Sequence, residues 1–110
     1  MTKKLFVSLP MRNHSIEELR PQMNDYLKRV EDRLNEEFSL INTLWEEPEP
    51  EDLKHHTYYL GKSITALSNA DLVVFVPGWH KAPGCVIEYE ICKLYGIPYY
   101  LLLTKEDDDA

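Results

Sequence analysis

The stretch from residue 70 to residue 98 constrains the fold more than any other part of this chain. It opens with the apolar run Leu72 to Val76, breaks at Pro77-Gly78, and continues with apolar residues at helical spacing from Gly84 to Gly96. A buried strand followed by a Pro/Gly loop and a helix is typical of an open α/β sheet. Ligands bind to such sheets in the crevice beyond the carboxyl ends of the strands. Glu88, in the second turn of the predicted helix, is therefore a candidate reactive group.

The same kind of pattern predicts the remaining elements. Ser15 and Glu18 form a capping box, which marks the start of a helix, and Pro21 then either kinks that helix or indicates a later start. Short apolar runs predict strands, and apolar residues at spacings of three and four predict helices. The predicted strands are residues 5–8, 38–42, 72–76 and 99–103, and the predicted helices are residues 16–37, a second from residue 53 or 56 to 68, and a third after residue 84.

The alternation of strands and helices predicts a small α/β fold. Strands that alternate with helices pair in parallel through right-handed crossovers, and continuous apolar strands are covered on both faces. We therefore expect a doubly wound, Rossmann-like parallel sheet of about four strands in the order 2-1-3-4, with helices on both faces. In that order the loops of residues 8–14 and 77–84 form the walls of one pocket. Residues 1–104 are expected to form a single domain, and residues 105–110 an acidic disordered tail.

Composition and charge exclude several classes of function. The formal net charge of the 110 residues is −7, which argues against binding a nucleic-acid polymer. No run of 18 apolar residues predicts a membrane span, and the short apolar start is interpreted as a strand rather than a signal peptide.

Cys85 and Cys92 fall roughly 10 Å apart on one helix, too far to bridge, which fits the reducing cytoplasm. The histidines lack the spacing of metal ligands, so no metal site is expected.

Several blocks of the sequence are similar to one known family. The chain resembles the nucleoside 2-deoxyribosyltransferase-like superfamily, specifically its small, mostly uncharacterised phage and bacterial branch, over nearly the whole length. The matching blocks are residues 6–13, 60–63, 70–71, 77–79, 84–88 and 95–98. The resemblance implies homo-oligomers of two or more subunits, in which a neighbouring subunit often completes the site, and it implies no cofactor. Residues 58–67 are apolar enough to contribute to such an interface.

The resemblance also implies a reaction and a nucleophile. In the family, a glutamate in a Gly-x-x-x-Glu pattern attacks the anomeric carbon of a nucleoside or nucleotide, and that pattern falls on Gly84 and Glu88. A carboxylate suits this task because a covalent glycosyl intermediate divides one difficult step into two. The family's catalytic aspartate corresponds to Ser63 here, which is expected to hydrogen-bond near the sugar. This departure leaves open whether another acid substitutes or the chemistry is weakened or absent.

The ligand-binding candidates lie in the two predicted pocket loops and on the second predicted helix. They are Ser8, Pro10, Met11, Arg12, Asn13, Lys62, Gly78, Trp79 and Gly84. Arg12 is either a surface residue or a bidentate clamp for an anion, supported by the backbone N–H groups around Gly84. Trp79 either stacks on a base or packs as a lid on the core edge, and Lys62 either adds charge or is solvated. Tyr58 and Tyr59 also invite stacking, although tyrosines buried in a helix are the simpler expectation.

Three functions remain open at this point. The first is an N-glycosidic-bond hydrolase or deoxyribosyltransferase with Glu88 as nucleophile. The second is a catalytically weak or inactive nucleotide-binding protein, which sequesters a nucleotide signal without cleaving it. The third is a structural oligomer whose pocket is vestigial. Two alternative roles also remain open: Glu88 as a surface glutamate near a helix N-terminus, and Cys85 as a nucleophile, for which the sequence shows no clear base.

Overall fold

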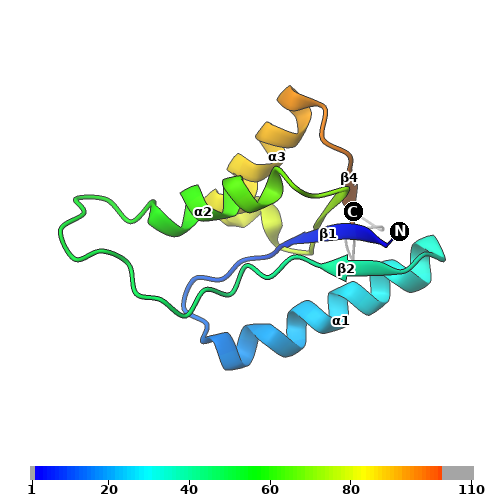
Figure 1. The fold of residues 1–110 in the computed structure, drawn as a ribbon, viewed down its shortest axis with the longest axis horizontal. Coiled ribbons are helices and arrows are strands. Elements are labelled where there is room, and N and C mark those ends of the chain that lie inside the picture. Colours follow the sequence, from blue (N-terminus) through cyan, green and yellow to red (C-terminus); the bar gives the residue numbers. More distant parts are fainter. Residues whose placement is uncertain (1, 103–110) are drawn as a thin grey trace.

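The computed structural model describes residues 2–102 and shows a four-stranded parallel sheet with three α-helices (Figure 1). The strand order is β2-β1-β3-β4, with every neighbouring pair parallel, which confirms the predicted doubly wound topology. The elements are β1 (Lys3–Ser8), α1 (Ile16–Leu34), β2 (Phe38–Leu40), α2 (Tyr58–Leu67), β3 (Leu72–Phe75), the 3₁₀ helix η1 (Trp79–Lys81), α3 (Pro83–Tyr95) and β4 (Tyr99–Leu101).

Helices cover both faces of the sheet. α1 lies on one face, whereas α2 and α3 lie on the other (Figure 1). Alternate residues of the central strands supply the two cores: Leu5, Val7 and Val74 pack with residues of α1, and Phe6 and Phe75 pack with residues of α2 and α3. All five of these strand side chains are buried. This arrangement explains the continuous apolar runs, because a strand that is covered on both faces needs apolar residues at every position.

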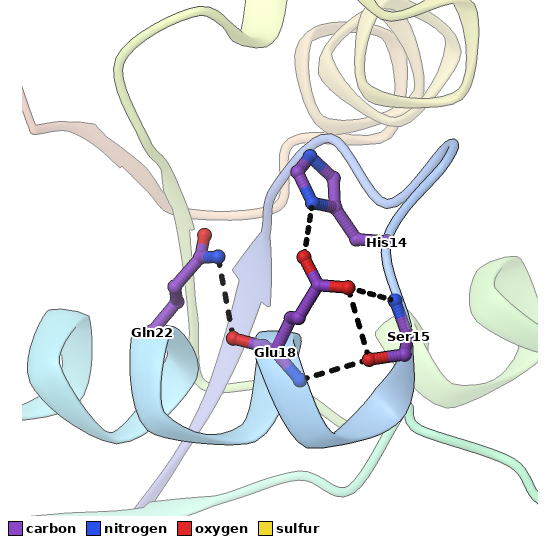
Figure 2. Close-up of polar contacts among 4 residues, drawn as sticks. All are labelled: His14, Ser15, Glu18 and Gln22. Atoms are coloured by element: carbon purple, nitrogen blue, oxygen red, sulfur yellow. Dashed lines mark hydrogen bonds and ion pairs between the residues drawn. The ribbon is translucent and has the colours of Figure 1, made fainter.

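The first helix begins where the sequence predicts. Ser15 Oγ accepts a hydrogen bond from the Glu18 backbone N–H, and the Glu18 carboxylate accepts one from the Ser15 N–H, which confirms the capping box (Figure 2). Pro21 lies inside α1, so the helix does not start later. It ends at Leu34 rather than at residue 37, because Asn35 adopts a left-handed conformation with φ of 52° and closes the helix.

The second helix is shorter than predicted. It begins at Tyr58 instead of residue 53 or 56, and residues 41–57 form a long connection without helix or strand. Leu67 is buried and Ile64 half-buried, whereas Tyr59 is 37% exposed and so only partly follows the expectation of a tyrosine buried in a helix. The predicted fourth strand ends at Leu101. Its last position and the acidic tail lie outside the described residues.

One further finding concerns membranes. Within residues 2–102, none of the helices combines the length with the apolar character that crossing a bilayer requires.

Candidate functional site

A small pocket lies where the carboxyl end of β1 meets the helices α2 and α3. Its wall takes residues from the end of β1 through Met11, from one side of α2, and from the start of α3. The lining residues are Phe6, Val7, Ser8, Leu9, Pro10, Met11, Tyr59, Leu60, Ser63, Ala82, Gly84, Cys85 and Glu88. The first predicted loop thus contributes its first half and the second only its last residues, while α2 supplies a wall that the two-loop prediction omitted.

Glu88 is the charged residue of this wall, and it is almost completely buried. Its side chain lies in the second turn of α3, and the residue is 5% exposed. Ser8, the last residue of β1, is 1% exposed and donates a hydrogen bond from Oγ to Glu88 Oε1 over 2.7 Å. The contact joins the central sheet to the helix across 80 positions of the chain. The carboxylate is therefore held in a defined place at the pocket.

The surroundings of Glu88 change its protonation. Burial raises the pKa of Glu88 from 4.5 to about 7, and the hydrogen bond from Ser8 partly opposes that rise. Among the described residues, the pocket lining includes no lysine or arginine that would neutralise the carboxylate. Both the protonated and the ionised forms are consequently populated near neutral pH, as is common for groups that act as acids, bases or nucleophiles.

The two cysteines flank Glu88 on the same helix face. Cys85 precedes it by three positions and Cys92 follows by four, and both are buried free thiols. Burial raises the pKa of each thiol to about 11, and the negative charge of Glu88 adds to the rise. Because the thiolate is the reactive form, a protonated Cys85 does not fit a nucleophilic role. The prediction that the pair is not bridged is confirmed.

The pocket brings together about half of the site residues predicted from the sequence. Glu88 and Ser63, the two catalytic candidates, both line it. The ligand-binding candidates in the wall are Ser8, Pro10, Met11 and Gly84. The candidates Arg12, Asn13, Lys62, Gly78 and Trp79 are not among the lining residues.

Arg12 and Asn13 lie beyond the pocket wall, in the turn that leads to α1. Both residues are exposed, and Asn13 adopts a left-handed conformation with φ of 68°. Asparagine tolerates this conformation well, so its place in the turn has a structural explanation.

Trp79 takes the packing role instead of covering the pocket. Its ring lies 4.5 Å from that of Tyr89 and 5.5 Å from that of Phe75, measured between centroids. Tyr99 of β4 contacts the same cluster. Gly78, with φ of 90°, supplies the left-handed turn that leads into η1. The structure thus favours the lid on the core edge over base stacking.

Lys62 lies on a different side of α2 from Ser63. Its ammonium donates a hydrogen bond to the carboxylate of Glu47 and lies 5.4 Å from the ring centre of Trp45 and 5.3 Å from that of Tyr58. These residues border an open groove of about 490 Å³ that is separate from the Glu88 pocket. The charge of Lys62 is therefore used to attach the connection of residues 41–57 to α2.

Tyr59 and Leu60 line the pocket, although the sequence pattern did not single out Leu60 and favoured a buried role over stacking for Tyr59. The Tyr59 hydroxyl donates to the carbonyl oxygen of Glu47 over 2.5 Å, which holds the ring at the pocket. A signal was present in the sequence, since Tyr59 and Ser63 are four positions apart and so share a helix face. Choosing Ser63 as a site residue therefore also indicated Tyr59.

The pocket has room for a sugar ring but not for a whole nucleotide. Its volume is about 170 Å³, close to the roughly 150 Å³ of a cavity that holds one benzene molecule and below the roughly 300–1,000 Å³ of drug-sized sites. A base or phosphate attached to a bound sugar would extend through the mouth of the pocket. As for metals, residues 2–102 contain no group of three or more His, Cys, Asp or Glu side chains placed to hold an ion.

Comparison with known proteins identifies a similar fold. No protein-family model and no curated protein matches the chain. A crystal structure described as a conserved protein from Enterococcus faecalis V583 superposes with a TM-score of 0.59 at 20% sequence identity. The match covers 96% of this chain and 65% of that one, so this chain spans slightly less than two thirds of its neighbour's length. A likeness at this identity shows a shared fold and carries no information about function.

Proposed function

We propose that this protein cleaves the N-glycosidic bond of a nucleoside, with Glu88 as the nucleophile, and passes the sugar to water or to a second base. The observation that carries the proposal is a buried carboxylate, held through one oxygen by Ser8, in the wall of a sugar-sized pocket. The pocket lies at the carboxyl end of β1, the edge at which α/β sheets bind ligands. The resemblance to the nucleoside 2-deoxyribosyltransferase-like superfamily, on residues 84–88 above all, supplies the reaction class.

The chemistry needs one carboxylate and an acceptor. The ionised Glu88 attacks the anomeric carbon, the bond from that carbon to the base nitrogen breaks, and the base leaves with the electron pair and takes a proton from solvent. A glycosyl ester of Glu88 remains. Water then attacks the anomeric carbon and loses a proton to solvent, which gives the free sugar, or the nitrogen of a second base attacks it and loses its proton to solvent, which gives a new nucleoside. In both cases the electron pair of the ester bond returns to the carboxylate.

The lining of the pocket favours neutral nucleosides over nucleoside monophosphates. Within the described part of the chain, Glu88 is the charged group that lines it, and no cation there would attract a phosphate. The formal charge of the whole protein is −7, which further disfavours an anionic substrate. The amide groups at the start of α3, which has no side-chain cap, supply hydrogen bonds to sugar hydroxyls near Gly84.

A second candidate function is binding of a nucleoside or nucleotide without turnover. The observation that favours it is Ser63, which lines the pocket at the position where the resemblance implies an aspartate. With a serine there, the described residues of the pocket wall include a single carboxylate, Glu88. No second carboxylic acid in that wall can therefore protonate the leaving base. A protein of this kind would retain and sequester its ligand.

Base release from a panel of substrates tests the proposal. The purified protein is incubated with deoxynucleosides and their 5′-monophosphates, and free base is followed by chromatography. We expect release from nucleosides that falls by about a thousandfold or more in Glu88→Gln. Glu90→Gln is the matched control, because Glu90 lies on the same helix but is exposed and pairs with Lys93 over 3.1 Å. It should retain full activity.

The alternative outcomes separate the candidate functions. Absence of base release together with thermal stabilisation by one nucleoside or nucleotide overturns the enzyme and supports the binder. Equal release from the wild type and Glu88→Gln overturns Glu88 as the nucleophile. Absence of both release and stabilisation overturns both functions and leaves a structural protein.

We also propose that the protein works as a cytoplasmic homodimer. Buried free thiols fit a reducing compartment. α3 rather than α2 carries the exposed apolar side chains that support the dimer, since Ile87, Leu94 and Tyr95 are 40%, 77% and 79% exposed. Leu94→Lys should convert a dimer to a monomer in light scattering, whereas Leu34→Lys on α1 should not; a monomeric wild type contradicts this.

A further inference from the structure

We infer that Ser8 is the positioning residue of this site, because its hydroxyl selects which oxygen of Glu88 meets the ligand and favours the ionised carboxylate. The consequence for catalysis rests on the proposed function above. The interaction itself does not, and it is open to direct measurement.

Ser8 is fixed by its place in the sheet. It is the last residue of β1, in register with Phe75 of β3, and its carbonyl oxygen accepts a hydrogen bond from the Val76 N–H over 3.2 Å. The residue is 1% exposed, so the hydroxyl has little freedom to turn toward solvent. A donor held in the central sheet is therefore directed at the carboxylate of α3.

The hydrogen bond distinguishes the two oxygens of Glu88. Ser8 Oγ donates its hydrogen bond to Oε1 of Glu88 over 2.7 Å. Among the described residues, the buried side-chain oxygens that lack a hydrogen-bond partner are Thr43 Oγ1 and Glu49 Oε1. Oε2 of Glu88 is not one of them, so this oxygen is not both fully buried and without a partner. Glu88 lines the pocket, and Oε2 is the oxygen left to meet a ligand there.

This assignment gives Ser8 a part in both halves of the proposed reaction. When Oε2 bonds to the anomeric carbon and the base leaves with its electron pair, Oε1 becomes the ester carbonyl oxygen and still accepts from Ser8. When water attacks the anomeric carbon, the bond to Oε2 breaks and the electron pair returns to the carboxylate. The hydroxyl then stabilises the charge that reappears on Glu88.

The groups that face Glu88 make Ser8 the main source of that stabilisation. From β1 it meets Ser8, and from its own helix it meets Cys85 and Cys92, whose raised pKa values keep both thiols protonated below about pH 9. From α2 the wall offers Ser63 and Tyr59, which carry no formal charge. The described wall provides no cation, so the Ser8 hydroxyl opposes the effect of burial.

A titration of Glu88 by NMR tests the inference without relying on activity. The side-chain carboxyl carbons are labelled with ¹³C, and Glu88 is assigned by its loss in Glu88→Gln. In Ser8→Ala we expect the midpoint of the Glu88 titration to move upward by about one pH unit or more, since a hydrogen bond to a charged group is lost. Ser8→Thr keeps the hydroxyl and should restore the wild-type midpoint. Retained folding is checked from the dispersed spectrum of each variant.

The outcomes keep the two proposals apart. An unchanged midpoint in folded Ser8→Ala overturns the inference, whatever the activity. A shifted midpoint without base release by the wild type supports the action of Ser8 on the carboxylate and overturns the proposed enzyme. If base is released, the pH at which kcat reaches half of its maximum should move by the same amount as the NMR midpoint. A fall in kcat with no change in that pH would overturn the positioning role.

Discussion

The two sides of α2 use charge in opposite ways. On one side, Ser63 and Tyr59 face a small pocket in which Glu88 is 5% exposed and has a hydroxyl, not a cation, as its partner. On the other side, Lys62 pairs with Glu47 in an open groove bordered by aromatic rings. Burial without a countercharge raises the pKa of Glu88 to about 7, whereas the Glu47 hydrogen bond raises the pKa of Lys62 and keeps it charged.

This contrast indicates which side of α2 is suited to catalysis. A carboxylate that changes its protonation near neutral pH is useful for catalysis but reduces the stability of the folded state when it is ionised. A paired and solvated lysine has neither effect. Its carboxylate partner and water keep it charged in the folded protein, and water alone keeps it charged in the unfolded chain. The pocket beside Glu88 is accordingly the functional candidate, and the Lys62 groove is interpreted as an attachment point for residues 41–57.

The largest expected effect that distinguishes the two sides is the pH dependence of stability. Glu88 has an ordinary pKa of 4.5 in the unfolded chain and about 7 in the folded protein. The folded state therefore holds the proton of Glu88 more tightly than the unfolded chain does. The stabilisation that this proton gives to the folded state is complete below pH 4.5 and is lost as the pH rises through about 7. We expect the free energy of unfolding, relative to Glu88→Gln, to fall by roughly 3 kcal/mol from pH 4.5 to 8.

Urea denaturation of both proteins across this pH range measures the difference. Subtracting the Glu88→Gln curve removes the titration of the other carboxylates. A difference that stays constant with pH, or that increases, would contradict the raised pKa of Glu88.

A smaller effect is expected at the two neighbouring tyrosines of α2. Tyr59 lines the Glu88 pocket and Tyr58 borders the groove. If a base lies at the pocket mouth on Tyr59, Tyr59→Ala should weaken nucleoside binding by about tenfold or more, from a stacking energy of about 1–3 kcal/mol. Tyr58→Ala, the matched control, should leave the affinity unchanged.

Calorimetric titration in the Glu88→Gln background measures this affinity without turnover. Equal losses in both tyrosine variants would mean that the pocket and the groove do not differ in ligand binding.

The smallest effect is expected from the Lys62 pair. Glu47→Gln removes the ionic partner of Lys62 while keeping the backbone carbonyl that accepts from Tyr59. It should cause a small loss of stability, which disappears at about 1 M salt because salt screens exposed charges. Thermal melts at low and high salt measure it. A large loss that salt does not reduce would place this pair among the structural determinants of the fold.

Local sequence patterns were sufficient to predict the architecture. The capping box of Ser15 and Glu18, the apolar runs, and the Pro/Gly loop before α3 act over a few residues, so they can be interpreted without knowledge of distant partners. The strand order then followed from general rules of parallel connections. The same patterns placed Glu88 at the carboxyl edge of the sheet, and the structure puts its side chain in the wall of a pocket there.

Element boundaries were less predictable because neighbouring structure decides them. Helix α1 ends where Asn35 turns left-handed, and α2 starts only at Tyr58, after a connection attached by contacts to Glu47. Helical periodicity continues past such points in the sequence, so it cannot mark them.

The sequence by itself determined the order and type of the elements, the parallel topology and the position of Glu88 on its helix, since these depend on local periodicity and general chirality. Only the tertiary structure decided that Ser8 donates to Glu88, that Trp79 packs on Tyr89, and that Lys62 pairs with Glu47 in a groove separate from the Glu88 pocket. Each of these depends on how two separate segments of the chain are placed against each other. That placement is set by the packing of whole cores, and a list of residues does not contain it.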